Sequence, residues 1–164
     1  MKNGKRGFTV VELVVTIAVI AVLGTMTTIT ISSLTNMQQD MNKMNSRNDQ
    51  VNSLANKIGE VTNFLSVRIE GSIEFGYHSN TANSITFKNR AIYEYTLSFS
   101  RQKLDFSNNY DGGSDYLRFS FSETYDLVEN VTFSFDEDIY LLTATISPTT
   151  GTSLTYAYTV EALS

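Results

Sequence analysis

The stretch that decides the fold is residues 7–31, which read GFTVVELVVTIAVIAVLGTMTTITI. As a helix, residues 8–31 would reach about 36 Å, enough to cross a hydrocarbon core of about 30 Å with some tilt. Eleven of residues 8–23 are Leu, Ile, Val or Phe, and together they favour insertion by roughly 3–7 kcal/mol. The one charge among them, Glu12, costs at most about 3 kcal/mol. The sequence therefore predicts a membrane-inserted helix over residues 8–31.

The residues before and after this stretch differ in charge. Residues 1–7 contain Lys2, Lys5 and Arg6 and no acid, whereas residues 34–164 contain nine basic and 16 acidic residues, a balance of −7. Basic residues beside a membrane helix favour the cytoplasmic side. We therefore expect a single-pass protein of the cell membrane, with its amino terminus in the cytoplasm and an acidic domain outside.

Three interpretations of this N-terminal stretch compete. A cleavable secretory signal explains the cations and the apolar run, but it leaves Glu12 unexplained, and residues 24–30 lack a clear small-x-small cleavage site. A plain signal anchor explains the length and orientation and also gives Glu12 no purpose. The protein would then be a membrane-anchored extracellular binding protein that does not polymerise. The third interpretation uses every residue.

That interpretation rests on residues 5–23, KRGFTVVELVVTIAVIAVL, where a basic leader, Gly7, Phe8 and Glu12 precede or open the apolar helix. This order resembles the N-terminus of type IV prepilins and their pseudopilin relatives. The resemblance implies a leader at residues 1–7, cleavage by a prepilin peptidase between Gly7 and Phe8, and N-methylation of Phe8. Implied partners are other pilin or pseudopilin subunits and an inner assembly-platform membrane protein. No cofactor is expected.

The resemblance also implies a role for Glu12, which would pair with the free amine of a neighbouring subunit's mature N-terminus. The physical need is general, because an unpaired carboxylate among packed apolar helices costs several kcal/mol. Pairing with the new terminal amine would relieve both desolvated charges and fix the axial register of the subunits. The alternative is that Glu12 reaches outward to the lipid headgroups.

One departure from the family concerns helix continuity. Many major pilins carry a Pro about three turns after that Glu, whereas the only Pro here is Pro148. The weakest helical stretch nearby is residues 24–30, because Gly24 costs about 1 kcal/mol relative to Ala and each of four Thr costs a few tenths. If the helix stretches in a filament, we expect it to do so there.

We expect the helix to continue as an amphipathic segment over residues 32–70. Apolar residues recur there at spacings of three and four, interrupted by Asn48. They are Leu34, Met37, Met41, Met44, Val51, Leu54, Ala55, Ile58, Val61 and Leu65. The part at residues 51–65 is predicted to pack on this chain's own domain. For the Met-rich part, two arrangements are equally expected. It contacts other subunits, which flexible thioethers suit, or it packs on this chain's own domain.

Residues 71–164 show a period of two. Apolar and polar residues alternate in the runs 85–87, 93–99, 117–121, 131–135, 142–146 and 154–160. Each run predicts a half-buried strand, and the short separators favour antiparallel neighbours. The predicted fold class is α+β and pilin-like, with one long N-terminal helix packed against an antiparallel β-sheet. With no Cys and several strands, the domain looks more like a minor pilin or pseudopilin than a major pilin.

Composition argues against catalysis and metal binding. The chain has no Cys, and its single His, His78, makes a His-based triad a poor expectation. The net charge of −5 disfavours a general nucleic-acid-binding fold. No nucleophile–base pair or phosphate-binding loop is evident, so we expect a structural protein rather than an enzyme. The resemblance places it in a type IV pilus, a competence DNA-uptake pseudopilus or a type II secretion pseudopilus, outside the cytoplasm after processing.

Three weaker site candidates remain in the predicted sheet domain. Residues 108–115 are rich in oxygen donors, with Asp111 and Asp115 as weak calcium candidates, but the spacing does not match an EF-hand and a solvated turn explains it. The acids at residues 136–138 fit a solvated hairpin turn. A basic cluster near Tyr93 and Tyr95 comprises Lys88, Arg90, Arg101 and Lys103. Such clusters can hold single-stranded DNA, but Glu94 dilutes this one, ordinary hairpin charge explains it, and DNA binding is not indicated.

Overall fold

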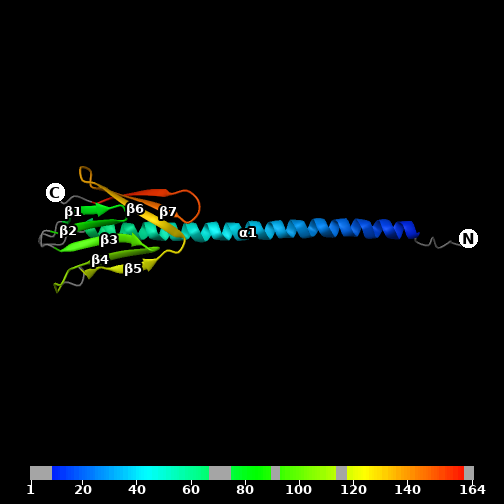
Figure 1. The fold of residues 1–164 in the computed structure, drawn as a ribbon, viewed down its shortest axis with the longest axis horizontal. Helices are drawn as coiled ribbons and strands as arrows, with labels where there is room; N and C mark the ends of the chain where they lie inside the picture. The colour runs from blue at the N-terminus through cyan, green and yellow to red at the C-terminus, as the bar shows by residue number, and fades with distance from the viewer. Residues whose placement is uncertain (1–8, 67–74, 90–92, 114–117, 161–164) are drawn as a thin grey trace, which may run out of the picture. The chain divides into compact units, whose positions relative to one another are not determined.

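The computed structural model describes residues 9–66, 75–89, 93–113 and 118–160. The chain divides into two compact units, Met1–Asn45 and Ser46–Ser164. Helix α1 (Val10–Ser66) contributes residues to both, and the strands belong to the second (Figure 1). The boundary expected between residues 70 and 71 lies outside the described residues.

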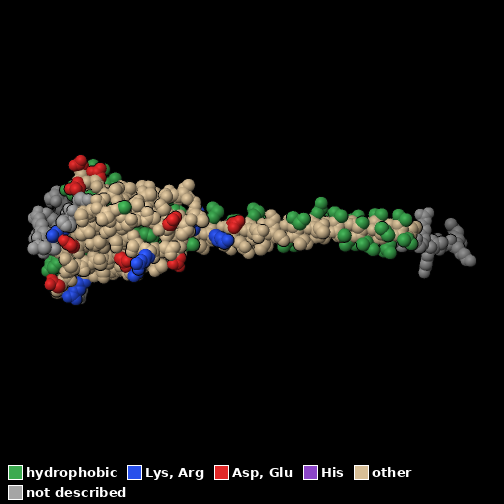
Figure 2. Space-filling view, in the orientation of Figure 1, with side chains coloured by type: hydrophobic (Ala, Val, Ile, Leu, Met, Phe, Trp, Pro, Cys, Tyr) green, Lys and Arg blue, Asp and Glu red, His purple; other side chains and the backbone are tan. Residues whose placement is uncertain are grey.

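In the first unit, α1 exposes its apolar side chains on all sides. Figure 2 shows green apolar side chains around the N-terminal part of this helix. They include Val10, Val11, Leu13, Val14, Val15, Ile17, Val19, Ile20, Val22, Leu23, Met26, Ile29, Ile31, Leu34, Met37, Met41 and Met44. A helix that is apolar all round is typical of a membrane span or of the buried core of a larger assembly. This surface therefore has to be covered by lipid or by other helices.

In the second unit, residues 46–66 of α1 bury one face. The buried apolar residues are Val51, Leu54, Ala55, Ile58, Val61 and Leu65. These are the same residues that the three-four spacing predicts to pack on this chain's own domain, so that prediction is confirmed. Thr62 is buried beside them, and its hydroxyl donates a hydrogen bond to the carbonyl of Gly59 at 2.8 Å. A buried hydroxyl is tolerated here because a backbone acceptor lies within reach.

The strands form two antiparallel sheets. The five-stranded sheet has the order β1-β2-β3-β4-β5, and the three-stranded sheet has the order β6-β7-β8. The strand bounds are β1 Phe75–Thr81, β2 Ser84–Asn89, β3 Glu94–Ser100, β4 Lys103–Asn108, β5 Phe121–Thr124, β6 Val128–Asp136, β7 Leu141–Pro148 and β8 Leu154–Thr159. Neighbours along the chain are neighbours in each sheet, which is the usual arrangement of consecutive strands. The predicted α+β class is confirmed.

The two sheets meet where the β1–β2 turn touches β6. The backbone N–H of Phe133 donates to the carbonyl of Ala82 at 2.9 Å. The Asn83 side-chain amide donates to the carbonyl of Val131 at 2.8 Å and also to the side chain of Asn130. These bonds satisfy part of the β6 edge, which would otherwise present unpaired backbone groups.

The sheets and the helix share one apolar core. Alternate residues of β3 and β7 are buried, as half-buried strands require. Phe64 of α1 contacts Tyr95 and Phe106 of the five-stranded sheet and also Phe119, which precedes β5; the ring-centre distances are 5.7 Å, 5.8 Å and 5.2 Å, respectively. Tilted and edge-on aromatic pairs of this kind stabilise the fold beyond the contribution of the apolar area that they bury.

Several details differ from the sequence-based prediction. The sequence predicts one sheet, and the structure has two. The alternation over 117–121 predicts a strand, but β5 begins only at Phe121. Strands β1 and β4 were not predicted. The expected separator at Arg101–Lys103 is a tight turn in which Arg101 and Gln102 both have positive φ, 51° and 62°, the geometry of a two-residue hairpin turn.

Candidate assembly site at the start of the long helix

Thr9 and Glu12 form a reciprocal cap at the start of α1. The Glu12 N–H donates to Thr9 Oγ1 at 3.2 Å, while Glu12 Oε2 accepts from the Thr9 N–H at 3.0 Å and from Thr9 Oγ1 at 3.1 Å. The Leu13 N–H donates to the carbonyl of Thr9 at 3.2 Å. This pattern is a capping box, which satisfies backbone donors that lack partners inside the helix. Thr9, the residue that caps α1, therefore also holds the Glu12 carboxylate.

The cap bears directly on Glu12 as the predicted assembly residue. A carboxylate in the first turn interacts favourably with the helix dipole, and two donors from Thr9 offset part of its desolvation. Glu12 is therefore hydrogen-bonded within its own chain. Thr9 was not singled out from the sequence, although the spacing Thr-x-x-Glu before an apolar run is a readable helix-start signal.

Threonine hydroxyls along the apolar part of α1 are also satisfied within the helix. Each donates to a carbonyl three or four residues earlier, at distances of 2.7–2.9 Å. The donors are Thr16, Thr25, Thr27, Thr28, Thr30 and Thr35. No hydroxyl of this set needs water, so the segment remains compatible with a lipid or helix-packed environment. α1 is also long and apolar enough near its N-terminus to cross a membrane.

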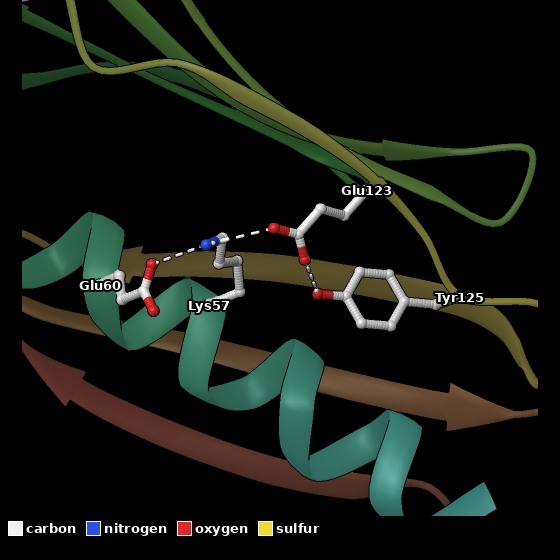
Figure 3. A network of polar contacts seen from close by, with 4 residues as sticks. All are labelled: Lys57, Glu60, Glu123 and Tyr125. Atoms are coloured by element: carbon white, nitrogen blue, oxygen red, sulfur yellow. Dashed lines mark hydrogen bonds and ion pairs between the residues drawn. The ribbon is translucent and has the colours of Figure 1, made fainter. Parts of the chain in front are cut away.

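A second polar group ties the five-stranded sheet to α1 (Figure 3). Lys57 Nζ lies 2.8 Å from Glu60 Oε2 on the same helix and 3.2 Å from Glu123 Oε1 on β5. The Tyr125 hydroxyl donates to the other oxygen of Glu123 at 2.9 Å. The hydrogen bond to Glu60 is the largest cause of the raised pKa of Lys57, and the hydrogen bond to Glu123 is the next largest. This network holds β5 on the helix and is a structural feature of the second unit.

Most of the predicted processing residues lie outside the described residues. These are Lys2, Lys5, Arg6, Gly7 and Phe8, together with the leader at residues 1–7. Their roles stay predictions, and so does the pairing of Glu12 with a neighbour's amine. The side chain of His78 and all of Arg90 and Asp115 also lie outside the described part of the chain.

The weaker candidates have ordinary local partners where they are described. A hydrogen bond to Asp111 raises the pKa of Tyr93, and over the described ranges no group of three or more His, Cys, Asp or Glu could hold a metal. Lys88 pairs with Glu94 at 3.5 Å, and Lys103 pairs with Asp105 at 3.5 Å. In the acidic turn, the Asp138 N–H donates to Asp136 Oδ1 at 3.0 Å.

Comparison with known proteins places the N-terminus in a recognised class. A family model for the prokaryotic N-terminal methylation motif matches residues 2–28. No curated protein and no solved structure matches the chain. The matched residues include Glu12, the capping Thr9 and most of the exposed apolar segment. The chain therefore carries at residues 2–28 a prokaryotic N-terminal methylation motif, which is the prepilin-type signal of type IV pilins, and its apolar helix is long enough to anchor it in a membrane.

Proposed function

We propose that this protein is a minor pilin or pseudopilin, a structural subunit cleaved after Gly7 and assembled with other subunits through the N-terminal part of α1. The observation that carries the proposal is a single carboxylate, Glu12, in an otherwise uncharged and exposed helical segment. After cleavage, the new amine of Phe8 on a neighbouring subunit supplies the opposite charge that Glu12 lacks among apolar helices. The role is structural, and no reaction is assigned to the chain.

The segment before cleavage is held with its amino terminus in the cytoplasm by Lys2, Lys5 and Arg6. The second unit then lies on the outer face of the membrane, and after assembly it belongs to an extracytoplasmic filament. Three systems use such subunits: a type IV pilus, a DNA-uptake pseudopilus and a type II secretion pseudopilus. Removing the assembly-platform protein of each system in turn, and measuring which loss abolishes the filament, identifies the one that uses this chain.

Replacing Glu12 tests the proposal. Glu12→Leu removes the charge and favours membrane insertion, so insertion and cleavage should be normal. Filament yield should fall more than tenfold if pairing contributes more than about 1.4 kcal/mol. Glu60→Leu is the matched control, because it removes a carboxylate from the exposed surface of the same helix and should leave assembly unchanged.

Mass spectrometry of the mature protein tests processing separately. The expected N-terminus is N-methylated Phe8. An intact Met1, or a cut well downstream of Phe8, contradicts the proposal. Normal assembly of Glu12→Leu also contradicts it and leaves a membrane-anchored exterior domain that does not polymerise.

A further inference from the structure

The two oxygens of the Glu12 carboxylate have different surroundings. Oε2 accepts hydrogen bonds from the Thr9 N–H at 3.0 Å and from Thr9 Oγ1 at 3.1 Å. Among the described residues, Oε1 has no hydrogen-bond or ion-pair partner. A carboxylate accepts up to about four hydrogen bonds through its two oxygens. Glu12 therefore keeps one oxygen available for a donor from outside its own chain.

The Thr9 hydroxyl makes one bond more than a helix cap requires. In a capping box the hydroxyl accepts from one backbone N–H, and the acid accepts from another; both bonds are present here. The bond from Thr9 Oγ1 to Glu12 Oε2 is a third one, between two side chains. Because it satisfies no backbone group, this bond serves the carboxylate rather than the end of the helix.

Within the described part of the apolar helix, only Thr9 donates to this carboxylate. Glu12 is the one charged residue from residue 9 to residue 39, so this segment contains no cation that could pair with it. The next hydroxyl along the helix, that of Thr16, donates to the Glu12 carbonyl at 2.7 Å. Thr9 is therefore the residue of this segment that decides where the Glu12 carboxylate lies.

The bonds to Thr9 also fix the direction of the Glu12 side chain. A helical side chain that reaches a residue three positions earlier points toward the N-terminus of its helix. The Thr9 N–H belongs to the peptide that links Phe8 to Thr9, so the carboxylate is held one residue from the predicted cleavage point. A glutamate without these bonds would be free to extend toward the lipid headgroups.

We propose that Thr9 is a positioning residue for assembly, which holds Oε2 of Glu12 and thereby leaves Oε1 to accept the terminal amine of a neighbouring subunit. The inference rests on the proposed function and adds Thr9 to the site that Glu12 forms there. An N-methylated terminal amine is charged and carries N–H donors, so its bond to Oε1 is charge-assisted. A carboxylate that is already held in place loses less side-chain freedom when this bond forms.

Thr9→Val tests the hydroxyl in the full-length protein, because valine keeps the shape and the N–H of threonine and removes the Oγ1 donor. The fraction of this chain recovered in sheared filaments should fall by about fivefold or more, the loss that one hydrogen bond of ordinary strength produces. Thr9→Ser keeps the hydroxyl and should restore recovery to within about twofold of wild type. Thr16→Val is the matched control, since it removes a hydroxyl bonded to the Glu12 backbone, and it should also stay within about twofold. Wild-type recovery of Thr9→Val, or an equal loss in Thr16→Val, overturns the inference.

Amide exchange separates a lost cap from lost positioning. Thr9→Val also removes the acceptor of the Glu12 N–H, but the Leu13 N–H donates to the Thr9 carbonyl, which valine keeps. In detergent-dispersed protein, the Leu13 amide of Thr9→Val should therefore exchange within about threefold of the wild-type rate. Faster exchange than this attributes the assembly loss to fraying of the helix and overturns the inference.

Cross-linking with a membrane-permeant carbodiimide, which joins a carboxylate to a nearby amine as an amide, tests the contact itself. In wild-type filaments, mass spectrometry should find Glu12 joined to the mature N-terminus of another subunit. In Thr9→Val, the yield of this product per assembled subunit should fall by about threefold or more. An equal yield in Thr9→Val overturns the inference, and so does a wild-type product in which Glu12 is joined only to the amine of phosphatidylethanolamine.

The outcomes separate the two proposals. If wild-type Glu12 is joined to another subunit's N-terminus and Thr9→Val is joined equally well, the proposed function stands and the role of Thr9 falls. If the wild-type protein is cleaved, is absent from filaments that sibling subunits form, and gives no such product, the proposed function fails and the role of Thr9 fails with it.

Discussion

The Tyr158 hydroxyl donates a hydrogen bond to the backbone carbonyl of Ala55 at 2.7 Å, which ties β8 to helix α1. The ring also lies over Gly59, where an added Cβ would come 3.5 Å from the Tyr158 ring. One side chain therefore positions the last strand of the three-stranded sheet on the helix. Burial raises the pKa of the Tyr158 phenol, which keeps it protonated and able to donate.

Replacing this tyrosine should destabilise the second unit. Tyr158→Phe removes the donor and should lower the free energy of unfolding by about 1–2 kcal/mol, because a half-buried carbonyl loses its bond. Urea unfolding of the full chain in detergent, followed by tyrosine fluorescence, measures the change. Tyr156→Phe is the control. Its hydroxyl lies 3.4 Å from Asn52 Oδ1 at an exposed site, so the cost should be under about 0.5 kcal/mol.

Alkaline pH should unfold the second unit through its buried tyrosines. Burial raises the pKa of Tyr95 to about 12 and that of Tyr125 to about 12, the latter helped by a hydrogen bond to Glu123. Unfolded tyrosines lose their protons near pH 10. Stability should therefore be constant with respect to these groups below about pH 9 and fall between about pH 10 and 12, by up to about 1.4 kcal/mol per pH unit for each tyrosine. Melting temperature against pH measures this; no alkaline decline would contradict the buried placement.

Lys57 should make a modest but measurable contribution to the free energy of unfolding of the second unit. Lys57→Met breaks ion pairs to Glu60 and Glu123 and removes a cation 5.0 Å from the Phe121 ring centre. Because these groups are partly exposed, the expected loss is about 1 kcal/mol, and it should shrink at high salt. Urea unfolding at two salt concentrations measures it.

The comparison variant for Lys57 is Glu60→Gln. It removes the ion pair within α1 and leaves the tie to β5, so it should cost under about 0.5 kcal/mol. Equal losses in both variants would show that the contact to β5 contributes nothing. A loss that does not depend on salt would point to packing of the Lys57 stem rather than to charge.

Gly24 should mark the softest part of the apolar helix. No atom lies within 4 Å of a Cβ built on Gly24, so Gly24→Ala introduces no clash. The change should stabilise the helix locally by about 1 kcal/mol and slow amide exchange over residues 24–30 about fivefold. Ala21→Gly is the reverse control and should speed exchange nearby. A filament map with unbroken helical density through residues 24–30 in the wild type would reject stretching at this site.

The long helix was predictable because its signals are local and repeated. Residues 51–65 bury the apolar stripe that the spacing predicts. Thr9 caps the helix, and its Thr-x-x-Glu spacing with Glu12 can be recognised in the sequence. The residues Met37, Met41 and Met44 follow the same spacing and are exposed. The spacing of an apolar stripe predicts a helix, but it does not show whether the stripe packs within its own chain or against another chain.

The strands were less predictable where their apolar residues are few. β4 has only Leu104 and Phe106 on its buried face, and the charged Lys103 and Asp105 beside them weaken the apolar signal. The apolar alternation at 117–121 gave a strand where only Phe121 begins one, because Phe119 packs against Phe64 and Phe106 as part of an aromatic cluster. The place where the two sheets meet depends on contacts such as that of Phe133 with Ala82, which are far apart in the sequence and leave no local pattern.

The three-stranded sheet is made from consecutive strands, and the last basic residue of the chain, Arg118, precedes all of them. Proteases that cut after lysine or arginine therefore have no site within β6, β7, β8 or the turns between them. Digestion with trypsin releases everything after Arg118 as one fragment, with the hairpin tips intact. Such a sheet is resistant to this class of secreted enzyme by its composition alone, even when it is unfolded.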